Sequence, residues 1–182
     1  NPKLWDGARL KPDVKDSLLK FGYAWSDYAN IPRDIIMDVI MTGGNANYNY
    51  TDISDIDVHL IVDKDKIAKG NELLDDYLQD KKMLWTMSHD IKVKGYPLEP
   101  YAQDYKAGYP KNQGAFSIMH NKWVQKPEHI DSTIVDDKLL KQKVKFYGHM
   151  IDNMIKNHMD PGAFSKFKQK LRDMRGSGIQ KG

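Results

Sequence analysis

Hydrophobic positions along the first part of the chain change between helical and strand spacing. Apolar residues recur every three or four positions over 12–29, which predicts a first helix. Ile31-Pro32 should end it, because the residue before a proline disfavours helical backbone. Two runs rich in β-branched and aliphatic residues follow at 34–42 and 53–63 and predict two core strands. A short helix is expected between them, over 45–50.

Beyond the second predicted strand the pattern first becomes helical and then returns to short strands. Leucines and aromatic residues at helical spacing are followed by alternating segments and by glycine and proline breakers. In chain order, the expected elements are a helix over 68–85, strands over 89–94 and 97–104, a loop over 105–113, and a hairpin of 115–119 with 122–124 around His120-Asn121.

After Pro127 the pattern is helical again and predicts two amphipathic helices. Asp160-Pro161 is typical of the cap and first turn of the second helix. The apolar stripes expected on the two helices are Leu139, Leu140, Val144, Tyr147, Ile151 and Ile155, and then Phe164, Phe167, Leu171 and Met174.

Mixed strands and helices of this kind predict an α+β fold with a β-sheet core and flanking helices. We expect the core and its N-terminal helix in residues 1–130 and a C-terminal helical segment in 131–182. A chain of 182 residues fits one domain with such an appendage. The chain begins at Asn1 without Met and ends in the glycine-rich stretch 176–178, so we expect a truncated segment of a longer protein.

Two acids stand one residue apart at the start of the second predicted strand. Asp55 and Asp57 should share one face, because side chains in a strand alternate with a period of two. At a separation of about 6 Å and an effective dielectric near 20, two carboxylates repel by about 2–3 kcal/mol. A cation between them would relieve this repulsion, and the dication that suits carboxylate oxygens and substrate phosphates is Mg²⁺.

A glycine pair lies upstream of the two acids. Gly43 and Gly44 follow the first predicted strand directly, after Thr42. A loop without Cβ atoms lets a phosphate approach backbone N–H groups, especially where a helix begins. The pair is therefore a candidate phosphate site, although a Gly-Gly turn without ligand explains the same letters.

Together these motifs resemble the signature of the nucleotidyltransferase superfamily, which includes DNA polymerase β and the minimal nucleotidyltransferases of bacteria. The chain has a hydrophobic residue, Gly-Gly, about ten residues and then Asp-x-Asp, with Ala46, Ser54 and Ile56 in register. Gly44 replaces the more frequent Ser, and Asn45 stands where an Arg is often found. The resemblance implies a nucleotidyltransferase-like mixed β-sheet.

A narrower resemblance links the chain to predicted nucleotidyltransferases of tailed bacteriophages. It rests on residues 45–51, 54–59 and 99–104, and weakens through 116–117 and 121–123. If the chain is encoded by a phage, it would act in the cytoplasm of the host.

In the superfamily a third carboxylate comes from a neighbouring strand, so the resemblance implies one here. Asp90, Glu99 and Asp104 are the candidates. Glu99 is preferred because it stands in the middle of a predicted strand, whereas the other two are at strand ends. An exposed edge-strand acid beside Pro100 remains the alternative for Glu99. The resemblance then implies that Asp55, Asp57 and Glu99 bind two Mg²⁺ or Mn²⁺ ions.

Other side chains are weaker candidates. Asn45 and Ser54 could donate hydrogen bonds to phosphate oxygens. His59 shares the face of the two aspartates and is either a metal ligand, particularly for Mn²⁺, or a cap of the strand end. Possible triphosphate clamps are Lys92, Lys94, Lys111 and Lys122, and possible base-stacking or core aromatics are Tyr48, Tyr50, Tyr101 and Trp123.

Composition narrows the class of protein further. Charged residues make up 29% of the chain, and no apolar run approaches the roughly 20 residues of a membrane span. The chain contains no cysteine, which excludes disulfides and thiolate zinc sites, and we expect a cytoplasmic protein. Acids gather in 52–80 and bases in 138–145 and 166–175. The basic segments are either solvated helix faces or a surface for a polyanion.

The expected reaction moves a nucleoside monophosphate from an NTP, with ATP favoured by its frequency in the superfamily, to a hydroxyl and releases pyrophosphate. The acceptor is open: a protein, an RNA or a small molecule. The alternative is a catalytically silent module of the same fold that binds nucleic acid or a protein partner. A third hypothesis is a neutralising partner in a two-component system, as minimal nucleotidyltransferases can be.

Overall fold

The computed structural model describes residues 1–129, 137–158 and 160–180. The chain divides into two compact units, Asn1–His129 and Ile130–Gly182. This division lies one residue before the expected boundary at 130/131. None of the helices in the described part of the chain is long and apolar enough to cross a membrane.

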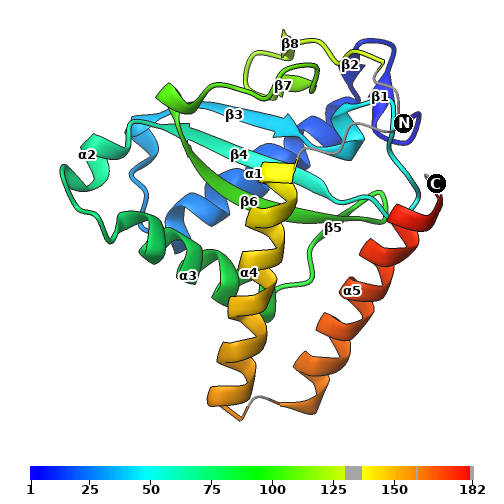
Figure 1. Ribbon diagram of the computed structural model, residues 1–182. Helices are drawn as coiled ribbons and strands as arrows, with labels where there is room; N and C mark the ends of the chain where they lie inside the picture. Colours follow the sequence, from blue (N-terminus) through cyan, green and yellow to red (C-terminus); the bar gives the residue numbers. More distant parts are fainter. Residues whose placement is uncertain (130–136, 159, 181–182) are drawn as a thin grey trace. The chain divides into compact units, whose positions relative to one another are not determined.

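The first unit is built on a six-stranded mixed sheet in the order β5-β6-β4-β3-β7-β8 (Figure 1). Strands β4 and β6 pair in parallel and every other neighbouring pair is antiparallel. The expectation of an α+β fold with a mixed sheet and flanking helices is thus confirmed. The strands are β3 (Ile36–Thr42), β4 (Ile56–Val62), β5 (Lys92–Val93), β6 (Tyr96–Asp104), β7 (Ala115–Ser117) and β8 (Lys122–Gln125).

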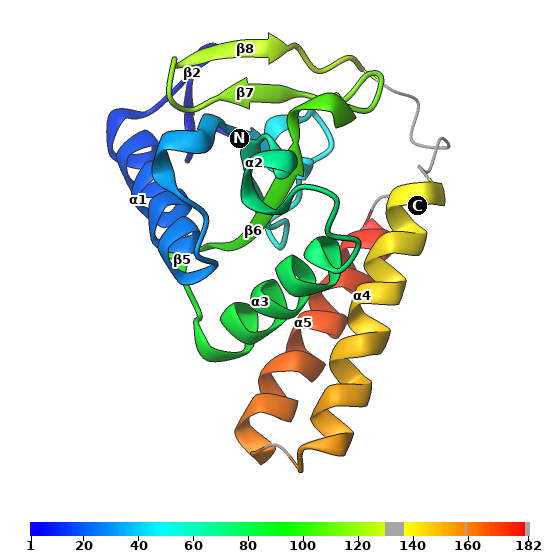
Figure 2. The ribbon, with the colours of Figure 1, turned by 90° about the vertical axis from the view of Figure 1, so that its left-hand side faces the viewer.

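Helix α1 (Pro12–Tyr28) packs its apolar side on one face of the sheet. Gly22 permits the close approach, since a Cβ there would lie only 3.2 Å from Val39 and 3.4 Å from Leu60. Helix α3 (Leu74–Ser88) lies beside β6 (Figure 2). It joins the same core through Trp85, which meets Trp25 edge to face. This face of the sheet is therefore apolar.

The opposite face of the sheet carries the polar side chains. In β3, Val39 and Met41 belong to the main core, whereas Ile40 belongs to a separate small cluster with Ile61 and Ala115. Thr42, on the same face as Ile40, is the register partner of Asp57 in β4. The candidate site residues thus lie on the face away from α1.

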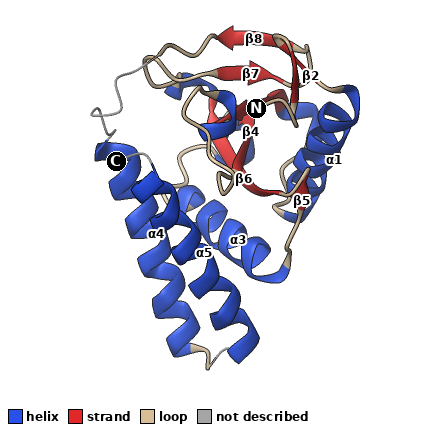
Figure 3. Cartoon of the chain, turned by 90° about the vertical axis from the view of Figure 1, so that its right-hand side faces the viewer, coloured by secondary structure: helices blue, strands red, loops and turns tan. Residues whose placement is uncertain are grey.

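A short N-terminal hairpin, absent from the sequence prediction, closes one end of the unit. Strands β1 (Trp5–Asp6) and β2 (Arg9–Leu10) pair around Gly7, and β2 lies near the β7–β8 hairpin (Figure 3). The Trp5 ring stacks on Trp123 at a centroid separation of 5.0 Å. This contact holds the N-terminal segment against the β7–β8 hairpin.

Several predicted elements have different bounds in the structure. The helix expected over 45–50 is only a single 3₁₀ turn, Gly44–Ala46, because residues 48–55 form turns and irregular backbone instead. The helix expected over 68–85 is two helices, α2 (Lys64–Ala68) and α3, separated by Gly70 at φ +68°. Strand β4 begins at Ile56, so Asp55 lies just before it.

The second unit contains helices α4 (Asp137–Lys156) and α5 (Pro161–Gln180), which confirms the two expected helices. The predicted stripe on α4 is wrong in part: Val144, Ile151 and Ile155 are exposed. Tyr147 of the predicted stripe is buried, but its buried neighbours are Met150 and Met154, because methionine fills irregular gaps that the pattern of branched residues does not reveal. The side chains of Leu139, Leu140 and Met174 lie outside the described residues.

Candidate metal centre and phosphate loop

Three carboxylates converge on the polar face of the sheet. Because β4 and β6 pair in parallel with Asp57 opposite Glu99, both side chains project to the same side. Asp55 stands two residues before Asp57 and joins them, and one carboxylate oxygen from each residue lies within 4.8 Å of the others. No other group of this kind is found among the described residues. The cluster could hold a metal ion, since oxygen ligands at this spacing suit Mg²⁺ or Mn²⁺.

Asp57 is the member of the cluster whose own surroundings leave it unsatisfied. Its side chain is 6% exposed, and its Oδ1 atom is buried without a hydrogen-bond partner. A buried carboxylate oxygen without a partner is costly and uncommon in folded proteins. A bound cation would compensate this atom directly, so the donor set fits a metal.

Glu99 is more deeply buried, at 2% exposure, but its Oε2 atom is engaged. The Tyr101 hydroxyl donates a hydrogen bond to Oε2 at 2.9 Å, and the Lys82 ammonium lies 3.6 Å from the same atom. Tyr101 is two residues further along β6 and Lys82 comes from α3. The carboxylate of Glu99 is therefore held by contacts from two elements.

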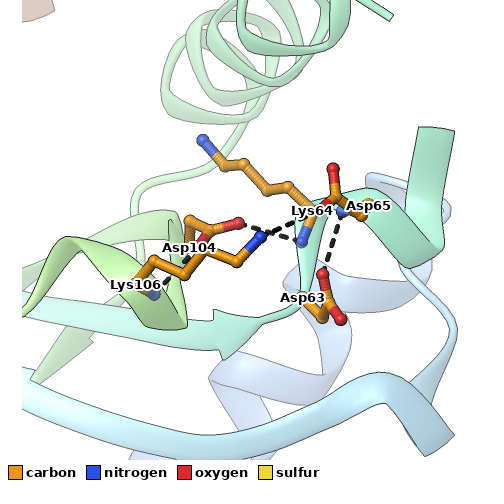
Figure 4. Close-up of polar contacts among 5 residues, drawn as sticks. All are labelled: Asp63, Lys64, Asp65, Asp104 and Lys106. Carbon is orange, nitrogen blue, oxygen red and sulfur yellow. Dashed lines mark hydrogen bonds and ion pairs between the residues drawn. The ribbon is translucent and has the colours of Figure 1, made fainter. Parts of the chain in front are cut away.

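The other two candidates for the third carboxylate lie elsewhere. Asp90 is largely exposed and faces Lys92 at 3.7 Å. Asp104 ends β6, five residues after Glu99, and accepts hydrogen bonds from the backbone N–H groups of Lys106 at 2.9 Å and Lys64 at 3.1 Å (Figure 4). These bonds, with Lys106 first, lower the pKa of the Asp104 carboxyl below its ordinary value. Of the three candidates, the structure brings only Glu99 to Asp55 and Asp57.

The Gly43-Gly44 pair packs directly against the acidic cluster. Gly43 has φ +78°, and a Cβ built there would clash with Asp57 Oδ2, so a larger residue is excluded on both grounds. A Cβ on Gly44 would lie 3.1 Å from Ser54 Oγ. The hydrogen bonds of the following 3₁₀ turn are donated by Ala46 and Asn47, so the turn does not use the N–H groups of Gly44 and Asn45.

The structure gives Asn45 and Ser54 roles that differ from the predicted phosphate contacts. Asn45 is 1% exposed, and its amide nitrogen donates to the carbonyl oxygens of Asp55 at 2.8 Å and Ser54 at 3.4 Å. The Ser54 hydroxyl accepts a hydrogen bond from the backbone N–H of Thr51 at 2.8 Å. Asn45 thus holds the Asp55 backbone and Ser54 holds Thr51, because the irregular segment before β4 needs partners for its polar groups.

The loop is held by further contacts from distant parts of the unit. Asn47 donates to the carbonyl of Gly43 at 2.7 Å and accepts from the N–H of Gly114 at 2.8 Å. The indole N–H of Trp5 donates to the carbonyl of Asn45 at 2.9 Å, and Asn1 donates to the Asn45 side chain at 2.6 Å. The loop beside the carboxylates is thus braced before any ligand arrives.

His59 lies on the predicted face but is occupied there. Its Nδ1 atom is 2.7 Å from Gln103 Oε1, and its ring stacks on Tyr101 at a centroid separation of 4.4 Å. His59 does not belong to the group of three acidic residues that could hold a metal ion. Its position supports a structural role along the β4–β6 pair.

The remaining candidates are placed by other contacts. Lys92 forms an ion pair with Asp90, and Lys94 forms one with Asp13. The side chains of Lys111 and Lys122 are exposed. Among the candidate aromatic residues, Tyr101 contacts the acidic cluster through its hydrogen bond to Glu99. The others are Tyr48, which is exposed and stacks on His129, Tyr50, which is half-buried, and Trp123, which packs on Trp5.

Sequence reasoning missed Lys82. It is 5% exposed and stands on the buried side of α3 with Leu74, Leu78 and Trp85. The signal was available: position 82 follows Leu78 by four residues, so a lysine falls on an otherwise apolar helical stripe. A lysine at such a position is rarely buried without an anionic partner.

Comparisons of the chain with protein-family models, with curated proteins and with solved structures gave no match.

Proposed function

We propose that the protein is a metal-dependent nucleotidyltransferase, which moves a nucleoside monophosphate from an NTP to a hydroxyl acceptor and releases pyrophosphate. The observation that carries the proposal is the buried, unpartnered Oδ1 atom of Asp57 inside a group of three converging carboxylates. A glycine loop packs against the same carboxylate. Transfer from a nucleoside triphosphate requires a cation site beside a loop that can bind phosphate.

Asp55, Asp57 and Glu99 would hold the dications, Mg²⁺ or Mn²⁺. When bound, these ions would neutralise charge on the triphosphate and on the reacting oxygens. The backbone N–H groups of Gly44 and Asn45, which the 3₁₀ turn does not use, would bind phosphate oxygens. The donor we favour is ATP.

The acceptor hydroxyl oxygen would form a bond to the α-phosphorus while the bond from that phosphorus to the β-phosphate oxygen breaks. Pyrophosphate then leaves with the electron pair of the broken bond. The proton of the hydroxyl would pass to the carboxylate of Glu99. The acceptor is a protein, an RNA or a small molecule.

Transfer of label tests the proposal. The protein is incubated with each α-³²P-labelled NTP, Mg²⁺ or Mn²⁺ and cell lysate, and the labelled species are separated by size. With the wild type we expect label to move to one class of macromolecule or small molecule. The control variant Asp90→Asn should behave in the same way, because Asp90 is exposed and does not belong to the acidic cluster. We expect no transfer of label with Asp57→Asn, which keeps the shape of the side chain but lowers its charge.

Direct metal binding separates the enzyme from a silent binding module. Electron paramagnetic resonance of Mn²⁺ titrated with protein reports bound ion without any need for the acceptor. Wild-type protein should bind Mn²⁺ and Asp57→Asn should bind it far more weakly. A wild type that neither binds Mn²⁺ nor transfers label would favour a module that binds nucleic acid or a protein partner.

A further inference from the structure

Lys82 is a nearly buried cation that touches the proposed metal centre from outside it. Its ammonium lies 3.6 Å from Glu99 Oε2 and 3.3 Å from the centroid of the Tyr101 ring. Lys82 and Glu99 side chains are 6% and 2% exposed, so water screens their interaction little. A pair held this closely acts on both the position and the charge of Glu99.

Two side chains contact the same oxygen of Glu99. The Tyr101 hydroxyl donates a hydrogen bond to Oε2 from the same strand, and the Lys82 ammonium forms an ion pair with it from α3. The two side chains also contact each other, because the ammonium lies over the Tyr101 ring. Glu99, Tyr101 and Lys82 thus form a triad in which each member orients the next.

Charge makes Lys82 different from Tyr101. Three ionised carboxylates within 4.8 Å of one another strongly repel, and a neighbouring ammonium offsets part of that repulsion before any metal binds. The same ammonium opposes an arriving dication. A hydroxyl does neither, since it carries no net charge.

We propose that Lys82 is a positioning residue for the metal centre: it holds Glu99 in place together with Tyr101, and it lowers the affinity of the three carboxylates for dications. The proposal rests on the metal-dependent function proposed above. The consequence is a site that is preformed without metal and that exchanges its ions readily. Removing Lys82 should therefore strengthen metal binding while weakening catalysis, a combination that a purely structural lysine would not produce.

The test measures Mn²⁺ affinity and transfer kinetics in parallel. Lys82→Met keeps a long side chain but removes the charge, and Tyr101 still holds Glu99 Oε2. We expect Mn²⁺ to bind on the order of tenfold more tightly, because a like charge next to the site is gone. We expect kcat to fall on the order of tenfold, since Glu99 loses a contact that holds it in position.

Three further variants make the result specific. Lys81→Met changes the adjacent residue, whose ammonium lies over the Tyr28 and Tyr77 rings, and should leave both quantities unchanged. Tyr101→Phe removes the hydroxyl but no charge, and should lower kcat without tightening Mn²⁺ binding. Lys82→Arg should return the Mn²⁺ affinity to the wild-type value, and a cavity of about 200 Å³ that Lys82 lines gives the longer side chain room.

The outcomes separate this role from the function itself. A wild type without Mn²⁺ binding overturns the metal centre and the role of Lys82 with it. Mn²⁺ binding that is unchanged or weaker in Lys82→Met overturns only the role of Lys82. Should that variant not fold, Tyr101→Phe and Lys82→Arg decide: tighter Mn²⁺ binding in either of them contradicts an effect of charge.

Discussion

The β4–β6 pair carries acids at both of its ends, and the two groups are built in opposite ways. At the start of the pair, Asp57 and Glu99 are buried, and Asp57 Oδ1 has no partner. At the far end, Asp104 accepts two backbone hydrogen bonds, and Asp65 meets the Lys106 ammonium at 2.9 Å (Figure 4). We call these the metal end and the capped end.

The comparison shows that acidity alone does not mark a metal site. Carboxylates at the capped end are satisfied by backbone N–H groups and lysines, so they need no ion. At the metal end three acids converge and two of them are buried, and although Lys82 and Tyr101 contact Glu99, Asp57 Oδ1 has no hydrogen-bond partner. What distinguishes a site for a dication is the charge that remains uncompensated when the chain has folded.

The largest expected difference between the two ends is catalytic. Glu99→Gln should lower the transfer rate by about 10³-fold or more, equivalent to roughly 4 kcal/mol of transition-state stabilisation. Asp104→Asn, on the same strand, should keep the rate within about threefold because it lies outside the metal end. Initial rates with labelled NTP and a purified acceptor measure both. Equal losses in the two variants would show that the metal end is not the active site.

The next effect concerns the loop that packs on Asp57. Gly43→Ala should destabilise the fold by about 2–4 kcal/mol, since the new Cβ clashes with Asp57 Oδ2 in addition to the strain at φ +78°. Gly70→Ala is the matched control: its φ is +68°, but no heavy atom lies within 4 Å of the added Cβ. It should cost only about 1 kcal/mol. Urea unfolding gives both values, and similar costs would argue against tight packing of the loop on Asp57.

Metal binding should stabilise the folded protein. At a Mn²⁺ concentration a hundredfold above Kd, the free energy of unfolding should rise by about 2.7 kcal/mol, because the ion binds only the folded state. EDTA should remove this gain, and Asp57→Asn should lack it while Asp104→Asn retains it. Thermal unfolding with and without Mn²⁺ provides the measurement. Stabilisation that persists in Asp57→Asn would place the ion elsewhere.

The smallest effect is expected at the capped end and depends on pH. The pKa of Asp104 is lowered in the folded state, mainly by the hydrogen bond from the Lys106 backbone. Its contribution to stability is therefore present above the ordinary pKa of 3.8 and is lost as the pH falls through the lower folded-state value.

Urea unfolding between about pH 5 and pH 3 tests this linkage. The loss of stability on acidification should be smaller in Asp104→Asn than in the wild type, since asparagine does not titrate. Identical slopes would mean that the hydrogen bonds to Asp104 do not favour its ionised form.

Much of the local structure followed from the spacing of apolar residues. Helix α1 was predicted from its periodicity and from the break at Ile31-Pro32, and it spans Pro12–Tyr28 in the structure. Strands β3 and β4 were predicted with longer N-terminal ends than they have. These predictions succeed because each of these elements buries one continuous apolar face. The spacing of apolar residues along a short stretch of sequence is enough to identify such a face.

Local pattern failed where a non-local contact decides. The helix expected after the glycines is only one turn, because the side chain of Asn45 binds the carbonyl of Asp55 and that of Asn47 accepts a hydrogen bond from Gly114. On α4, Met150 and Met154 are buried in place of the exposed Val144, Ile151 and Ile155, on a helix that packs on α5 through Tyr147 and Phe167. In each case the partner lies far along the chain or on another element, so no short window of sequence contains the information.

The sequence by itself determined that two acids one residue apart follow a glycine pair, and that the chain supplies helices and strands for an α+β fold. Only the tertiary structure decided that Glu99 rather than Asp90 or Asp104 joins them, that Asp57 Oδ1 is left without a partner, and that Lys82 reaches Glu99. The physical reason is register. The parallel pairing of β4 with β6 sets Asp57 opposite Glu99, and shifting it by one residue would turn Glu99 to the other face of the sheet.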